Sequence, residues 1–181
     1  MYKRQATYSQ QIKEKTIVIN GVSKTFSMTG WRIGYTAGPK NIIEAINRFQ
    51  GHASGNPASI SQYASLVALK TPASFLDAWV KEFRQRKDYI VGELNSIEGV
   101  SCTDPAGAFY VFPDVSGLYG RTYGGKKIKD SVELSYYLLE NGRIAVVPGR
   151  AFGADNHIRL SFATSMENVV EGMRRLKEAL A

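Results

Sequence analysis

Only two short apolar segments precede the long amphipathic stretch in the middle of this chain. Residues 16–20 (TIVIN) and 32–38 (RIGYTAG) have the composition of strands. Residues 73–98 carry apolar side chains at helical spacing. Two strands alone leave both faces of a sheet uncovered. The pattern therefore predicts part of an α/β sheet, then a connecting long helix, then a second lobe.

The chain after Gly99 changes to a strand-rich pattern. A helix is expected around 130–140, and a capping box at 164–167 (TSME) predicts the start of a last helix. The expected strands are GVSCTD at 99–104, AFYVFPDV at 108–115, RIAVVPG at 143–149 and HIRLSFA at 157–163. We therefore expect a small α+β domain over 99–181, with residues 73–98 as the connecting helix.

Composition excludes several classes of protein. The 181 residues are 44% hydrophobic and 22% charged, which fits one packed domain and excludes a disordered tail. The sequence contains no apolar stretch of membrane-spanning length, and no secretory signal at the start. The single cysteine, Cys102, excludes an internal disulfide framework and suggests the cytoplasm. His52 and His157 lack ligand spacing, so no metal site is expected.

The net charge of +7 could suggest a nucleic-acid partner. The excess is confined to residues 1–50, which hold eight Lys and Arg against two Glu. No arginine-rich helix, zinc-ligand spacing or RNA-binding strand signature accompanies it. We therefore favour a solvated basic face over nucleic-acid binding, and some of these charges could hold a small anion.

The most specific motif is SKTFSMTGWR at residues 23–32. Lys24 follows a strand in a loop of small residues, and Arg32 stands eight positions later. Apolar walls from Phe26, Met28 and Trp31 would partly desolvate the lysine, which favours its nucleophilic neutral form. The planar fork of an arginine suits a phosphate. Chemistry alone leaves two interpretations open: a Schiff-base lysine with a phosphate anchor, or an ordinary surface lysine and a paired arginine.

The stretch SKTFSMTGWRIGY resembles the cofactor-lysine signature of class I aminotransferases, pyridoxal-phosphate enzymes of fold type I, most closely the bacterial aspartate aminotransferase branch. The resemblance implies that Lys24 forms the Schiff base with pyridoxal 5′-phosphate and that Arg32 binds its phosphate. Ser23 is a candidate for a hydroxyl contact to that phosphate. The position three before the lysine, commonly serine in the family, is Gly21 here.

Three later regions extend the resemblance. HASGNPASISQYA at 52–64 is similar to the segment near the neighbouring subunit's cofactor in the family homodimer. DPAGAFYVFPDVSG at 104–117 resembles the small-domain strand pair, and IAVVPGRAFG with HIRLSFATSMENVVEGMRRL resembles the C-terminal signature. By this likeness Arg159 binds the substrate α-carboxylate. Taken alone, Arg159 could equally be a strand arginine in a salt bridge.

The resemblance implies an aminotransferase that moves an amino group between an L-amino acid, with aspartate favoured, and a 2-oxo acid. Residues 1–72 would be the remnant of the large cofactor-binding domain. The family's aspartate on the cofactor ring nitrogen lies upstream of the lysine, whereas the first Asp of this sequence is Asp77. We therefore expect a C-terminal fragment that is inactive by itself. MYKRQ resembles a translated sequencing-library transposon end, so residues 1–5 are expected to be non-native.

Alternatives to transamination remain open at this point. Another fold type I enzyme, such as a Cα lyase or synthase, would share the lysine motif. A non-catalytic dimerising fragment would share the fold without turnover. No membrane partner and no nucleic-acid partner are expected.

Overall fold

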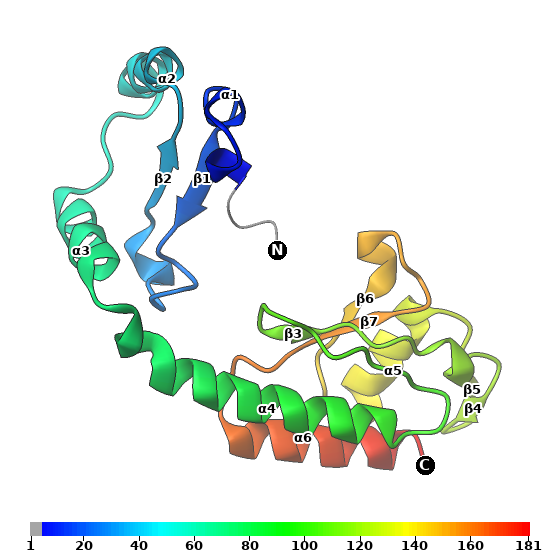
Figure 1. Cartoon of the computed structure of the whole chain (residues 1–181). Coiled ribbons are helices and arrows are strands. Elements are labelled where there is room, and N and C mark those ends of the chain that lie inside the picture. Colours follow the sequence, from blue (N-terminus) through cyan, green and yellow to red (C-terminus); the bar gives the residue numbers. More distant parts are fainter. Residues whose placement is uncertain (1–4) are drawn as a thin grey trace. The chain divides into compact units, whose positions relative to one another are not determined.

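The computed structural model describes residues 5–181, which divide into two compact units. Unit 1 ends at Leu76 and unit 2 covers Asp77–Ala181 (Figure 1). The expectation that residues 1–5 are non-native falls almost wholly on residues 1–4, which lie outside the described residues. The unit boundary lies four residues beyond the expected end of the first domain at residue 72.

Unit 1 is a strand pair with helices before and after it. Its strands pair antiparallel, with Val18 opposite Ala37 and Gly21 opposite Gly34. The elements are a 3-10 turn at Gln5–Thr7, α1 (Gln10–Lys13), β1 (Val18–Gly21), a 3-10 turn at Thr29–Trp31, β2 (Gly34–Ala37), α2 (Lys40–Ala53), α3 (Ser59–Lys70) and a 3-10 turn at Ala73–Leu76. Both expected strands are present.

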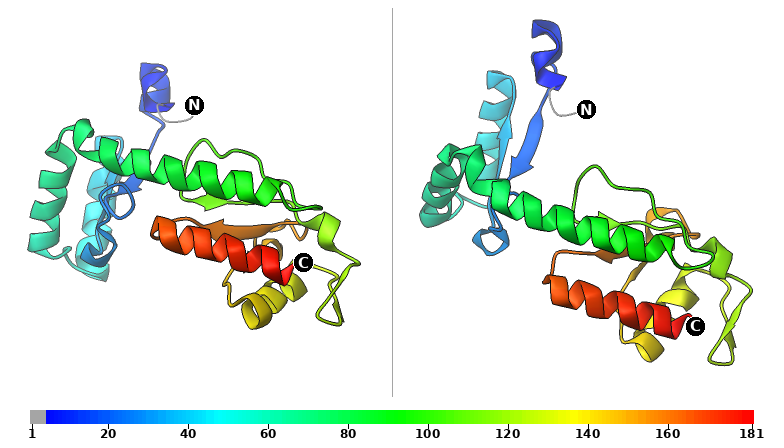
Figure 2. Two further views of the ribbon diagram at one scale, coloured as in Figure 1. Left: turned by 90° about the horizontal axis from the view of Figure 1, so that it is seen from below. Right: turned by 60° about the horizontal axis from the view of Figure 1, so that its bottom comes forward.

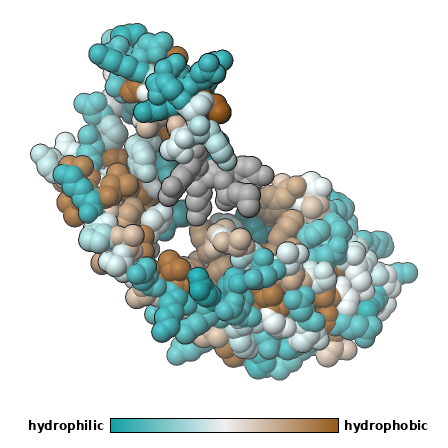
Figure 3. All heavy atoms as spheres, in the orientation of Figure 1, coloured by the Kyte–Doolittle hydropathy of each residue, from teal (hydrophilic) through white to brown (hydrophobic). Residues whose placement is uncertain are grey.

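Little of unit 1 is buried. Among its described residues the buried side chains are Val22, Ser61 and Ser65. Large apolar side chains are open instead: Ile19 on β1 is 81% exposed and Phe49 on α2 is 76% exposed. Brown side chains are visible on this part of the surface in Figure 3. The strand pair thus has the uncovered faces that its sequence predicts.

Unit 2 contains a three-stranded antiparallel sheet in the order β3-β7-β6. Val111 pairs with Leu160, and Val147 pairs with Arg159. The elements are α4 (Asp77–Asn95), β3 (Tyr110–Val111), a 3-10 turn at Ser116–Leu118, β4 (Thr122–Tyr123), β5 (Lys126–Lys127), α5 (Ser131–Gly142), β6 (Val147–Pro148), a 3-10 turn at Gly149–Phe152, β7 (Ile158–Ser161) and α6 (Met166–Ala179).

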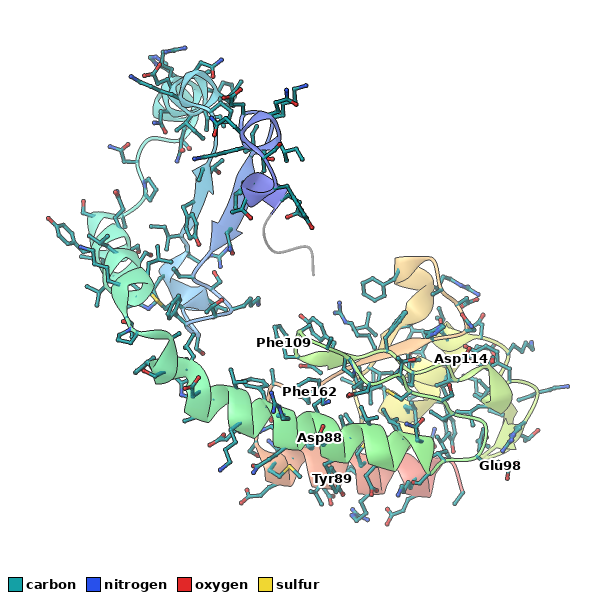
Figure 4. All side chains as sticks on the ribbon, viewed as in Figure 1. Asp88, Tyr89, Glu98, Phe109, Asp114 and Phe162 are labelled. Carbon is teal, nitrogen blue, oxygen red and sulfur yellow. The ribbon has the colours of Figure 1, made fainter. Side chains whose placement is uncertain are left out.

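One face of this sheet and the helices enclose the core of unit 2. α4 and α6 lie side by side (Figure 2), and α5 also packs on α6. Leu94 of α4, Leu138 of α5 and Met173 of α6 are almost completely buried. Phe162, labelled in Figure 4, lies just beyond β7, and its N–H donates to the carbonyl of Phe109 (3.0 Å). Burial of apolar area on this scale is what stabilises unit 2.

Three local expectations need correction. The helix expected over 73–98 is a 3-10 turn followed by α4, whose Ile90 and Leu94 belong to the core of unit 2. The segment GVSCTD makes a single bridge, Ser101 to Asp114, and the backbone N–H and carbonyl of Cys102 bond to the Asn95 side chain and not to a strand. The last helix is capped by Ser165, whose hydroxyl accepts from the Asn168 N–H (3.2 Å), so its start lies one residue later than the sequence suggests.

No helix in residues 5–181 is both long and apolar enough to cross a membrane. Within the same range, no cluster of three or more His, Cys, Asp or Glu side chains is arranged to hold a metal ion.

Candidate functional site

Lys24 lies in a tight turn between β1 and the 3-10 turn at Thr29–Trp31. The N–H of Phe26 donates to the carbonyl of Val22 (3.1 Å), and the N–H of Met28 donates to the carbonyl of Ser23 (3.1 Å). The buried side chain of Val22 anchors this turn. Such short-range bonds hold the backbone on both sides of Lys24 and fix where its side chain leaves the main chain.

The Lys24 side chain is exposed. The expectation of a desolvated lysine is therefore not met by the residues of unit 1. Phe26 and Met28 are only half-buried, and Trp31 is 44% exposed, so these side chains do not enclose the amine. These residues are close to Lys24 in the sequence, but an amine is desolvated only where atoms surround it on all sides.

Arg32 begins the approach to β2 in a left-handed backbone conformation, with φ of 49°. Ser27 has φ of 55°, so two non-glycine residues of this short segment are in that region. Each costs about 1–3 kcal/mol, and such strain concentrates at functional sites. The guanidinium Nη1 of Arg32 donates to the Thr29 carbonyl (2.9 Å). Within the described residues Arg32 has no carboxylate partner, which leaves further donors for an anion.

Helix α3 supports the backbone beside Arg32. The buried hydroxyl of Ser61 donates to the carbonyl of Trp31 (2.8 Å). This bond joins residues 30 positions apart and fixes the peptide that precedes the arginine. The sequence gives no signal for Ser61, because nothing distinguishes it from Ser59 and Ser65 on the same helix.

Ser23 is half-buried, and its carbonyl takes part in the lysine turn. Gly21, where the family commonly has serine, lies opposite Gly34 in the strand pair. A Cβ at Gly21 would lie 3.3 Å from the carbonyl oxygen of Ile33. A hydroxyl at this position would therefore need a small shift of β2. The role of Ser23 in cofactor binding stays a prediction.

Arg159 belongs to unit 2, where it is the second residue of β7. Its neighbours Ile158 and Leu160 are buried in the core, so alternation directs Arg159 to the other face of the sheet. Its guanidinium carbon lies 4.5 Å from the ring centre of Tyr110 and 4.7 Å from that of Phe152. Within the described part of the chain Arg159 has no ion pair, which counts against the salt-bridge interpretation.

An ion-pair network supports the turn that carries Phe152. Arg150 donates from Nη2 to Asp155 (2.7 Å) and to Asp130 (2.9 Å). The Ser131 hydroxyl donates to Asp155 (2.6 Å). The Arg150 guanidinium, followed by Ser131, holds the pKa of Asp155 below its usual range. Burial raises the pKa of Tyr119 to about 12, and its hydroxyl donates to the Asp155 carbonyl (2.5 Å).

The donors of unit 1 fit two ends of pyridoxal phosphate. An exposed primary amine at Lys24 suits the aldehyde, and an arginine without a carboxylate partner among the described residues suits the phosphate. The cofactor's ring nitrogen would need a carboxylate partner. The only acids among the described residues of unit 1 are Glu14 and Glu44, and Glu44 pairs with Lys40 on α2. The described residues of unit 1 thus offer groups suited to the aldehyde and to the phosphate of such a cofactor.

Comparison with known proteins defines the class of protein. Residues 2–176 match the family described as aminotransferase class I and II. The chain belongs to that family, and the fold type I assignment made from the sequence is confirmed. The aspartate aminotransferases are the branch of this family to which its relatives belong, and they depend on pyridoxal phosphate.

Particular relatives narrow the likeness. The chain is 44% identical over 169 residues to an aspartate aminotransferase of Rhizobium meliloti (strain 1021), covering 93% of this chain and 41% of that protein. It is 46% identical over 165 residues to an aspartate/prephenate aminotransferase of Cereibacter sphaeroides, covering 91% and 41%. A crystal structure of the Rhizobium meliloti aspartate aminotransferase matches with a TM-score of 0.91 at 43% identity, over 95% of this chain and 43% of that one.

The chain therefore spans about two fifths of the length of the relatives it matches. Relatives with other names match the same region: an aromatic aminotransferase of Pyrococcus horikoshii has a TM-score of 0.81 at 38% identity, over 93% of this chain and 44% of that one. The shared region thus defines the family more sharply than it defines the amino acid used.

Proposed function

We propose that the whole protein containing this chain is an aminotransferase that moves an amino group between aspartate and a 2-oxo acid, with pyridoxal phosphate held on Lys24. One observation carries the proposal. An exposed lysine and an arginine without a carboxylate partner among the described residues lie in one strained segment, whose sequence resembles the family's cofactor-lysine motif. Aspartate is favoured because the Rhizobium meliloti and Cereibacter sphaeroides relatives carry it in their names at 44% and 46% identity.

Each residue has a defined task in this proposal. When bound, pyridoxal phosphate supplies an aldehyde and an electron-withdrawing ring. Lys24 would hold the cofactor by its aldehyde group, and the Lys24 amine, when it is not bonded to the cofactor, would accept the proton from the substrate Cα as a general base. Arg32 binds the phosphate through its guanidinium N–H groups. Arg159 binds the substrate α-carboxylate with two parallel N–H donors, which orients the Cα–H bond.

The first test is activity. We expect the 181-residue chain to show no turnover of aspartate and 2-oxoglutarate, because unit 1 offers no carboxylate placed for the cofactor ring nitrogen. The longer protein, expressed from the source DNA, should be active, and Lys24→Ala should lower its kcat by at least about 10⁴-fold. Robust turnover by the 181-residue chain, or an active Lys24→Ala variant of the longer protein, would contradict this proposal.

Assembly and location complete the proposal. We propose a homodimer, supported by the open apolar side chains Ile60 and Tyr63 in the segment that resembles the family's subunit contact. Light scattering on the longer protein should give twice the mass of one chain, and a monomeric enzyme would contradict the proposed homodimer.

We also propose a cytoplasmic location, supported by the single free thiol of Cys102. Recovery of the enzyme in a membrane or secreted fraction would contradict it.

A further inference from the structure

The environment of Arg159 on the open face of the sheet is unusual for a charged side chain. It lies on the central strand of the three, with β3 on one side and β6 on the other. Tyr110 comes from β3, and Phe152 comes from the turn that follows β6. The two rings therefore approach Arg159 from neighbouring segments on opposite sides of β7.

Among the residues that the structure describes, the guanidinium contacts ring faces and no carboxylate. Its carbon lies over both rings, at 4.5 and 4.7 Å from their centres. Contacts of this kind attract a cation to the ring and leave its charge uncompensated. A guanidinium stacked on rings still has its N–H groups in its own plane, along the edge. The N–H groups are therefore the part of this side chain that is suited to a ligand.

We propose that Tyr110 and Phe152 form an aromatic clamp that positions Arg159, so that its N–H edge is presented to the planar carboxylate of the substrate. This inference rests on the proposed function, because it assumes the carboxylate role of Arg159. Tyr110 and Phe152 are positioning residues here, since they act through the arginine. The clamp explains how a long, flexible side chain keeps one orientation without a carboxylate partner.

The fold keeps Phe152 in place although half of its surface is open. Its turn is closed by the N–H of Gly149, which donates to the His157 carbonyl (2.8 Å). Phe112 packs edge-on against Phe152, with ring centres 5.9 Å apart, and stacks on His157 at 4.7 Å. The Arg150 ion pairs tie the same turn to the start of α5. The second ring of the clamp is thus held by contacts that do not involve Arg159.

The test uses nuclear magnetic resonance of the Arg159 Nε–Hε group in the 181-residue chain, with acetate as the carboxylate probe. Arg159→Lys assigns the resonance by removing it. In the native chain we expect shielding of the arginine side-chain protons by the two rings, and a shift of Nε–Hε on acetate addition. Phe152→Leu and Tyr110→Leu should each reduce the shielding and weaken acetate binding about fivefold.

Matched variants separate a ring effect from a general loss of structure. Phe152→Tyr and Tyr110→Phe keep both rings and should bind acetate within about twofold of the native chain. Tyr136→Leu removes an exposed aromatic ring from α5 and should change neither the shielding nor the acetate affinity.

The outcomes distinguish the two claims. If the native chain responds to acetate at Arg159 but the leucine variants bind it equally well, the clamp is wrong and the proposed role of Arg159 stands. Unshielded arginine protons in the native chain would likewise overturn the clamp alone. If the native chain shows no acetate response at Arg159, both the carboxylate role and the positioning inference fail.

Discussion

At the scale of single residues, environment decides which of two interpretations of a side chain holds. From the sequence, Arg159 could bind a carboxylate ligand or form a salt bridge. In the structure it contacts Tyr110 and Phe152 and has no ion pair within residues 5–181. The sequence could not show this, because Tyr110 is far from Arg159 in the chain and the contact with Phe152 depends on how the turn between them folds. For Lys24 the sequence suggested burial by the apolar residues that follow it, but its side chain is exposed in the structure.

Gly149 offers a sharp test of the turn beside Arg159. A Cβ at this position would lie 2.1 Å from the Ala154 carbonyl oxygen and 2.3 Å from that of His157. Both neighbours are backbone atoms that cannot move without breaking the turn. We expect Gly149→Ala to destabilise unit 2 by about 3 kcal/mol or more, measured by urea unfolding.

Gly172 provides the matched control for that substitution. It lies within α6, and a Cβ there would meet no atom within 4 Å. Gly172→Ala should stabilise the protein by about 0.5–1 kcal/mol, because alanine has the higher helix propensity. Equal effects of the two substitutions would show that the close approach at Gly149 is not real.

At the scale of elements, the sequence predicted most of the segments but not all of their pairings. Periodicity identified β1, β2, β7 and the long helices, because their patterns are local. The glycine-rich segment 117–125 contains β4, and Gly124 and Gly125 form the two-residue turn into β5. Their positive φ angles suit such a hairpin turn. The short strands 122–123 and 126–127 carry too few residues for a recognisable pattern.

The start of α6 gives a test at this scale. The sequence motif predicts Thr164 as the N-cap, whereas the structure has Ser165 in that position. Ser165→Ala should cost about 1 kcal/mol of unfolding free energy, because the Asn168 N–H loses its partner. Thr164→Ala should cost less, since it removes only a bond from the Asn168 side chain (2.9 Å). The reverse order in urea unfolding would place the cap at Thr164.

At the scale of the whole chain, the two units differ in what holds them together. Unit 2 has a continuous buried core, whereas the described residues of unit 1 bury three side chains. The sequence predicted that the first domain ends at residue 72, and the first unit of the structure ends at Leu76. The physical reason is that α4 buries Ile90 and Leu94 within unit 2.

This difference predicts unequal local stability. Amide hydrogen exchange of the 181-residue chain should be at least about a hundredfold slower in α6 and β7 than in β1 and β2. The strand pair has open apolar faces, so its opening costs little burial. Equal protection of β1 and α6 would show that unit 1 is stabilised by contacts that its exposed side chains do not reveal.

The central claim is that Lys24 carries the cofactor, and peptide mapping tests it most directly. The longer protein would be mixed with pyridoxal phosphate, reduced with borohydride and digested. The account predicts one modified peptide, containing Lys24, and loss of that modification in Arg32→Ala at cofactor concentrations that saturate the native enzyme. Attachment to another lysine, or no attachment in an active enzyme, would contradict it.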